Sequence, residues 1–391
     1  FKRLERDLDY GDADYHGDAG PISIRRYPPA DLLVQHQAFL EASTKLGYPA
    51  CDDANDPDGW GAGPQPMNKL GRLRVSCAIG YLAPARVRPN LTIRADTLVT
   101  RLVVEGGKCT GVVVETADGS IETVAGTTTV LCAGALLSPG ILMRSGLGPS
   151  GALDGLGLQV LHAVPGVGAN LSDHPALSVN CAVRNPDIID FDAPMIQTIL
   201  RYTAPGSEYR NDLQIEQLSF SGRPGRPASF AIAAVLEYQH GRGELRLTSA
   251  DPHAAPVIDN RFCEDPRDSD RLVACYRDTL AFTRAEPLAG MIDEITFPRD
   301  VDSMSDADLA ALCRRFAGSG YHPCGTLKMG PASDAQAVVD SFGCSHHLDN
   351  LAVADASIMP WVPRANTNLT AIMIGEKIGE WIRTRPGIYG L

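Results

Sequence analysis

Residues 134–148 read GALLSPGILMRSGLG, a helical pattern that ends in a cluster of glycines. Within and just after it, Gly146, Gly148 and Gly151 have the G-x-G-x-x-G spacing of a dinucleotide-binding turn. Such a turn needs a strand before its first glycine and a helix that starts at its last. Here a helical pattern precedes Gly146, and Pro149 interrupts the motif. We therefore interpret Gly146 as the residue just past a helix end, where glycine adopts a left-handed conformation at little cost.

The size and composition of the chain indicate a packed globular protein, with either two domains or one large domain with an inserted second layer. It has 391 residues, which is more than one core usually holds, and 44% of them are apolar. A net charge of −12 argues against a surface for nucleic acid or anionic membranes. The ten cysteines contain no C-x-x-C pair, so we expect no disulfide framework, no structural zinc and a cytoplasmic location. No apolar run is long enough to span a bilayer.

Periodicity and turn signals predict the main elements of the chain. Apolar residues at helical spacing indicate helices in residues 29–49, 136–146, 268–284 and 368–383. Residues 90–134 read as a β-meander, broken by the hairpin signals EGG at 105–107 and ADG at 117–119. Alternating residues at 229–239 and 243–249 indicate strands of an antiparallel sheet, and the Asp, Pro and Gly content of 52–71 indicates a loop.

Residues 134–148 resemble the second signature of the glucose–methanol–choline (GMC) flavoprotein oxidoreductases. Further blocks resemble the same family, in the family's order. They are RPNLTI (88–93), GVGANLSDHP (166–175), GRGELRLTSADPHAAPVID (241–259), YHPCGTLKMG (321–330), VADASIMP (353–360) and PRANTNLTAIMIGEK (363–377). The resemblance extends over about residues 71–383, which is most of the chain.

The resemblance implies an α/β (α+β) fold with part of a Rossmann-like FAD-binding domain and an antiparallel-sheet substrate domain. It assigns residues 1–175 to the partial FAD domain, 176–317 to the substrate domain and 318–391 to a return into the FAD domain that carries the active site. Members of the family begin with a strand, a true G-x-G-x-x-G and a helix that bind the ADP half of FAD. Nothing before Gly71 has this pattern, so we expect a truncated or processed chain, or one half of a split enzyme.

Alcohol oxidation needs an electron sink for a hydride, which a flavin supplies and side chains do not. It also needs a base, and His322 in the glycine-rich loop 318–325 is the candidate because imidazole titrates near neutral pH. The loop alone is equally consistent with a buried histidine bound to a backbone carbonyl, and the resemblance favours the base. Asn366 matches the position that pairs with this histidine to fix the alkoxide, although an asparagine there could instead cap the final helix.

The resemblance also implies which residues contact the flavin. They are Val99 near the adenine, Ala133 and Gly134 at a close backbone approach, Asp355 and Ala356 near the ribityl–pyrophosphate, and Asn366 and Thr367 at the pyrimidine edge. The N-terminus of the final helix would bring positive partial charge to that edge. Gly134 lacks a Cβ, so its backbone can approach a ligand closely.

Three functions remain open at this point. The first is FAD-dependent oxidation of a small-molecule alcohol to an aldehyde or ketone, by hydride transfer to flavin N5. The second is a hydroxynitrile lyase of the GMC type, which uses the same histidine for acid–base chemistry. The third is a fragment that is inactive without a second polypeptide carrying the ADP-binding unit. We expect residues 191–202 and 212–222 to line the substrate pocket, no metal at His346 and His347, and a packing role for Cys324.

Overall fold

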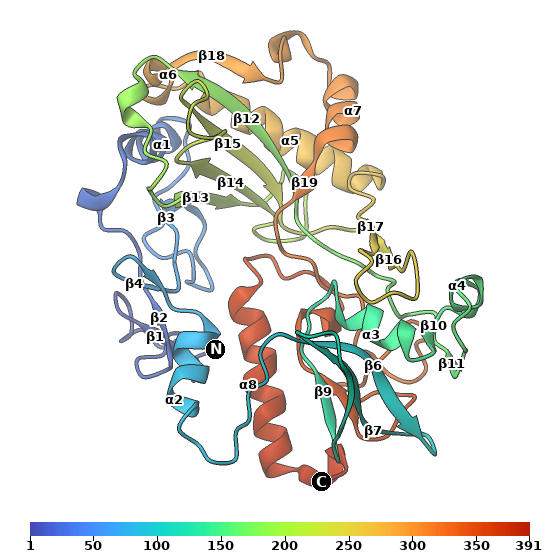
Figure 1. Cartoon of the computed structure of the whole chain (residues 1–391). Coiled ribbons are helices and arrows are strands. Elements are labelled where there is room, and N and C mark those ends of the chain that lie inside the picture. The colour runs from blue at the N-terminus through green and yellow to red at the C-terminus, as the bar shows by residue number, and fades with distance from the viewer. The chain divides into compact units, whose positions relative to one another are not determined.

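A computed structural model describes residues 1–391, which form two compact units (Figure 1). The first, here the sheet unit, contains Phe1–Ala83, His174–Gly241 and Phe262–Gly320. The second, here the meander unit, contains Pro84–Asp173, Arg242–Arg261 and Tyr321–Leu391. The sequence assigned residues 1–175 to one part of the protein, whereas the contacts group residues 1–83 with the sheet unit.

A seven-stranded antiparallel sheet forms the centre of the sheet unit (Figure 1). Six strands follow the order β18-β12-β15-β14-β13-β3, and β19 pairs with the start of β12. Their bounds are β3 Gly61–Pro64, β12 Pro175–Val183, β13 Ile196–Tyr202, β14 Leu213–Leu218, β15 Ser229–Leu236, β18 Ile292–Phe297 and β19 Gly318–Ser319.

One face of this sheet packs on helices α1 (Val34–Lys45) and α5 (Pro266–Phe282). Along α5, the buried side chains Leu272, Cys275, Tyr276 and Thr279 follow the spacing of a single helix face. Along the strands, every second side chain joins the same core, because successive residues of a strand point to opposite faces. The helices predicted in 29–49 and 268–284 are thus confirmed.

The remaining elements of the sheet unit are short. They are β1 Glu5–Asp7 and β2 Ile22–Ile24, which pair in parallel, β4 Lys69–Leu70 and β5 Leu73–Arg74, which form a hairpin, and helices α6 Leu288–Met291 and α7 Asp306–Phe316. Helix α2 (Ala83–Ala85) lies at the end of the unit's first segment.

The loop predicted for residues 52–71 is wrong in part, because β3 is an edge strand of the large sheet that pairs with β13. Its glycines serve close approach of the backbone rather than a turn. A Cβ at Gly63 would lie 1.7 Å from the carbonyl oxygen of Cys51. Composition therefore indicated a loop where packing requires a strand with glycine at two of its four positions.

The meander unit contains the predicted three-stranded meander of β6 Thr97–Glu105, β7 Lys108–Thr116 and β8 Ile121–Ala125. Gly106 and Gly107 both have positive φ in the two-residue turn between β6 and β7, which confirms the hairpin signal EGG. Gly119 also has positive φ, in the turn before β8.

The next strand, β9 (Thr129–Leu131), pairs in parallel with β20 (Leu351–Val353), which lies far along the chain. Helix α3 (Ser138–Arg144) follows β9 and ends at Ser145. Gly146 comes next with φ +83°, and its N–H donates to the carbonyl of Met143. The interpretation of Gly146 as a residue past a helix end is therefore confirmed.

The other elements of the meander unit are β10 Leu147–Gly148, β11 His162–Ala163, α4 Ser150–Gly155, β16 Glu244–Arg246, β17 Val257–Asp259 and α8 Asn368–Thr384. The strand predicted at 243–249 does not join the large sheet, because β16 pairs with β17 in a separate antiparallel pair. None of the helices has both the length and the apolar character that a membrane crossing requires.

A buried ion cluster attaches the first residues of the chain to the loop after α1. His16 Nδ1 lies 2.8 Å from Glu5 Oε1 and its Nε2 lies 2.8 Å from Asp53 Oδ2. Arg26 donates to Asp7 at 2.8 Å and to Asp53 at 2.5 Å. Burial alone lowers the pKa of His16, but the hydrogen bonds to Asp53 and Glu5 outweigh it, so this pKa lies above its usual value. The imidazole is thus held in its charged form.

We expect the protein to lose stability as the pH rises above about 6.5, because His16 then loses the proton that links two buried carboxylates. For a raised folded-state pKa, the contribution is complete below about pH 6.5 and is lost as the pH passes the folded value. His16→Gln should lower the free energy of unfolding by about 3 kcal/mol or more at acidic pH, and should remove most of this pH dependence. Urea unfolding at a series of pH values measures the free energy of unfolding and its dependence on pH.

The exposed His253 provides the control, since His253→Gln should leave the pH dependence of unfolding as in the wild type. Equal pH dependence in the wild type and in His16→Gln would contradict the assignment.

Candidate active site

His322 lies in a loop of the meander unit that a neighbouring segment holds in place. Ser172 and Cys324 exchange two backbone hydrogen bonds, of 3.0 and 2.9 Å. The backbone N–H of His322 donates to Oδ1 of the buried Asp173 at 2.9 Å. Tyr321, just before it, has φ +65° and is 90% exposed. The loop therefore presents a half-buried imidazole on a fixed backbone.

The side chain of Asn366 meets this imidazole. Its Nδ2 lies 3.2 Å from His322 Nε2, although the two residues are far apart in the sequence. An amide nitrogen only donates, so Nε2 acts as the acceptor and the ring proton of the neutral histidine is on Nδ1. Asn366 is exposed. A small molecule can therefore reach an unprotonated ring nitrogen and an amide donor side by side.

Asn366 does not cap the final helix. The residue at the N-cap of α8 is Thr367, and its side chain makes no capping hydrogen bond. The first hydrogen bond within the helix runs from the Ala371 N–H to the Thr367 carbonyl. The N–H groups of the helix before Ala371 therefore have no partner within the helix. The 17-residue helix thus directs positive partial charge to the position beside Asn366.

Asp355 joins the carboxyl ends of the parallel strands β9 and β20. Its Oδ2 accepts from the Gly134 N–H at 2.9 Å and from the Ser138 hydroxyl at 2.7 Å. Its Oδ1 accepts from the Ser357 N–H at 2.8 Å, and the side chain is buried. Both carboxylate oxygens therefore bind the protein itself. Ligands of open α/β sheets bind at this end of the strands.

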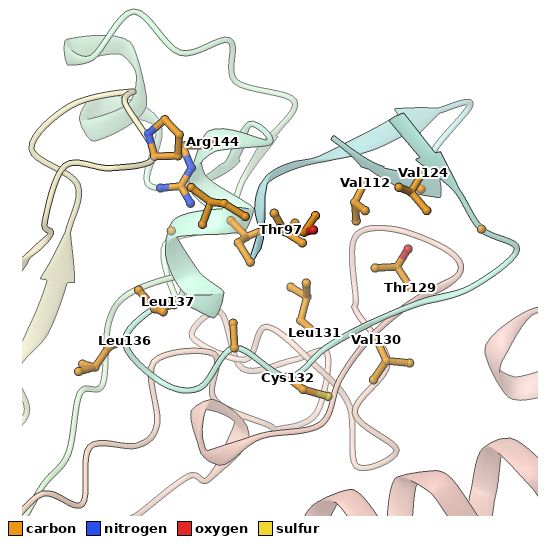
Figure 2. A pocket seen from close by; sticks show the side chains of 18 of the residues that line it. Thr97, Val112, Val124, Thr129, Val130, Leu131, Cys132, Leu136, Leu137 and Arg144 are labelled. Carbon is orange, nitrogen blue, oxygen red and sulfur yellow. The ribbon is translucent and has the colours of Figure 1, made fainter. Parts of the chain in front are cut away.

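The predicted cofactor residues Val99 and Ala133 line a cavity of about 660 Å³ (Figure 2). Its walls come from the meander, β9, α3 and residues 247–256, and they are mainly aliphatic. Arg144 is the one charged residue of the lining. The volume of the cavity and its mainly aliphatic lining are both usual for sites that bind small molecules. Next to it, Gly134 has φ +80°, and a Cβ there would meet nothing within 4 Å.

Two residues of the site were not identified from the sequence. Asp173 accepts a hydrogen bond from the backbone N–H of His322, and the Ser138 hydroxyl donates one to the Asp355 carboxylate. Both partners lie far away along the chain. Both are in quoted blocks, at 166–175 and 134–148, which is the one signal that could have indicated them. Cys324, beside His322, is fully buried, and burial raises the pKa of its thiol to about 12. Its expected role as a packing residue is confirmed.

The chain is similar to several known proteins. Two family models described as GMC oxidoreductase match residues 2–176 and 239–375. The chain is 34% identical to the oxygen-dependent choline dehydrogenase of Klebsiella pneumoniae over 424 positions, which cover 98% of this chain and 74% of that protein.

Two solved structures are also similar. The crystal structure of pyridoxine 4-oxidase from Mesorbium loti is 28% identical with a TM-score of 0.89, over 98% of this chain and 76% of that one. A fungal aryl-alcohol oxidase is 22% identical with a TM-score of 0.81, over 95% and 74% of the two chains, and this likeness concerns the fold alone.

We expect Asp355→Asn to lower the free energy of unfolding by about 2–4 kcal/mol. The amide nitrogen cannot accept the hydrogen bonds from Gly134 and Ser138, so buried donors lose their partner. Urea unfolding followed by circular dichroism measures the loss, and Asp154→Asn, at an exposed position of α4, should change it little. An unchanged unfolding midpoint in Asp355→Asn would show that this carboxylate does not hold the two strand ends together.

Proposed function

Because the chain belongs to the GMC oxidoreductase family, we propose that it oxidises the CH–OH group of an alcohol to a carbonyl, with FAD as its cofactor. The observation that carries this proposal is the contact between His322 Nε2 and Asn366 Nδ2. Choline and pyridoxine, which occur in the names of two relatives, are both alcohols.

The two side chains have different tasks in this reaction. An alcohol hydroxyl that displaces the hydrogen bond between the two side chains donates its proton to the unprotonated Nε2 of His322, which acts as the general base. The Asn366 amide cannot take up a proton, so it donates a hydrogen bond to the oxygen. This bond becomes stronger as negative charge develops on the alkoxide. The Asp173 carboxylate keeps the His322 backbone in place while the proton moves.

The residues of the meander unit fit a flavin nucleotide. When bound, FAD would supply the electron sink that alcohol oxidation needs. Val99 and Ala133 would hold its adenine end at the aliphatic cavity, and Gly134 leaves open space for a close approach. Asp355 and Ala356 would lie along the ribityl chain. The uncapped N-terminus of α8, with Asn366 and Thr367, would stabilise negative charge on the reduced ring.

Two segments of the sheet unit stay our candidates for the lining of the substrate pocket. Residues 191–202 and 212–222 contribute β13 and β14 to the sheet. On the face away from α1 and α5, these strands carry a mixture of polar and aliphatic side chains. They are Ile199, Arg201, Gln214, Glu216 and Leu218.

We expect His322→Gln to lower the rate constant for flavin reduction about 10²- to 10⁴-fold, because no other group takes the hydroxyl proton. Anaerobic mixing of the flavin-loaded protein with an alcohol panel, followed by bleaching of the flavin absorbance, measures this rate. His253→Gln, at an exposed histidine, is the matched control. If no alcohol bleaches the wild-type flavin, the proposal fails, and acid–base chemistry without hydride transfer becomes the better hypothesis.

Asn366→Ala should lower the same rate constant about 10²-fold, since one hydrogen bond to the developing alkoxide is lost. The base is unchanged in this variant, so its rate should keep the wild-type dependence on pH. A variant with a wild-type rate would exclude Asn366 from the reaction.

A further inference from the structure

Two cysteines, Cys263 and Cys313, meet in the core of the sheet unit. Cys263 lies in the turn before α5, two residues ahead of the N-cap residue Asp265, and Cys313 lies in the second half of α7. Both are free thiols, and both are buried in the same apolar cluster. The thiol of Cys263 donates a hydrogen bond to the sulfur of Cys313. Residues from two separate helical regions thus place their sulfur atoms together.

This hydrogen bond makes the two thiols chemically unequal. It raises the pKa of Cys263, and it lowers the pKa of Cys313 because it favours negative charge on the accepting sulfur. Burial opposes the shift of the Cys313 pKa, and the Arg314 guanidinium adds to it. Burial and the Asp268 carboxylate raise the pKa of Cys263 further. Cys313 is therefore the better nucleophile, and Cys263 is a protonated thiol in contact with it.

Helix α7 gives a small molecule a route to this pair (Figure 1). Of its eleven residues, only Leu309 and Cys313 are buried, and the helix packs on α5. An element with so few buried side chains opens locally at a low cost in free energy. A small oxidant can thus reach Cys313 while the sheet stays folded, although both sulfur atoms are buried when α7 is closed.

The backbone of Cys263 adopts a conformation that is uncommon for a residue with a Cβ. Its φ is +59°, in the left-handed region, and Arg261, two residues earlier, has φ +49°. Such conformations persist where the surrounding structure imposes them, and they are concentrated at functional sites. The fold, rather than a local preference of the chain, therefore directs the Cys263 side chain to Cys313.

We propose that Cys263 and Cys313 form a redox-active pair, which hydrogen peroxide oxidises to a disulfide. The Cys313 thiolate attacks one peroxide oxygen and the O–O bond breaks, so that Cys313 becomes a sulfenic acid and the leaving hydroxide takes up a proton to form water. The Cys263 sulfur then displaces the hydroxyl group of the sulfenic acid. That hydroxyl leaves with the Cys263 proton as a second water. The two sulfur atoms lose two electrons, which the peroxide gains.

The disulfide would join α7 to the chain just before α5. It would close a loop of about 50 residues, which restricts the unfolded chain, and it would prevent α7 from opening. We expect peroxide to raise the melting temperature of the protein by about 5 °C or more, and dithiothreitol to reverse the change. The inference goes beyond the proposed function and does not depend on it, because neither cysteine takes part in the oxidation of an alcohol.

Peptide mass spectrometry of the wild type tests the proposal without any substitution. The protein is treated with increasing peroxide, its free thiols are blocked with N-ethylmaleimide in denaturant, and it is digested. We expect a pair of peptides joined through Cys263 and Cys313, which reduction separates, at peroxide concentrations that leave the exposed Cys77 and Cys132 free. If Cys77 and Cys132 become oxidised while Cys263 and Cys313 both carry the maleimide label, the proposal is wrong.

Single variants assign the thermal shift to this pair. Cys263→Ala and Cys313→Ala should each lose the rise in melting temperature on addition of peroxide. Cys181→Ala should keep it, because Cys181 is buried in the same core and only burial shifts its pKa. In Cys263→Ala the oxidation should stop at the sulfenic acid of Cys313, which dimedone labels. A reversible shift that persists in Cys263→Ala or Cys313→Ala would show that a different bond causes it.

Discussion

The arrangement of the meander unit depends on the hydrogen bonds that the buried carboxylate of Asp355 accepts. Through Gly134, Ser138 and Ser357 it connects the ends of two parallel strands that come from opposite halves of the chain. The chain continues from β20 to Asn366 and α8. The hydrogen bonds of Asp355 therefore also determine where the segment begins that carries Asn366, the partner of His322. A single buried carboxylate thus relates the predicted flavin-contacting backbone to the residues proposed to act on the alcohol.

The elements that could be predicted from the sequence are those encoded by local signals. The glycines at 106 and 107 define a hairpin by their conformational freedom, and the apolar spacing of α5 defines its buried face. Gly146 was correctly placed at a helix end because its flanks are helical. Strand β3 was missed, since its residues carry no strand signal and its pairing with β13 is decided by tertiary contacts. Pairing between strands that lie far apart in the sequence produces no periodic pattern of residues from which it could be predicted.

The candidate site was less accessible to reasoning from residue types alone. An isolated loop histidine is as compatible with a structural role as with catalysis, and only the family resemblance favoured His322 as a base. The structure brings Asn366 against it, a proximity that neither residue signals by itself. Asp173 acts through a backbone amide, and such a contact requires only a carboxylate at the right place in space.

The pairing of β9 with β20 also has a consequence for biosynthesis. Thr129 pairs with Leu351, so the ribosome adds about 220 residues between the appearance of one strand and of its partner. At usual elongation rates this interval is about 10–40 s, long compared with the formation of a helix or hairpin. The β6–β8 meander can form in that time, whereas the edge of β9 is exposed throughout. Nascent chains of this protein should therefore depend on chaperones until β20 has been made.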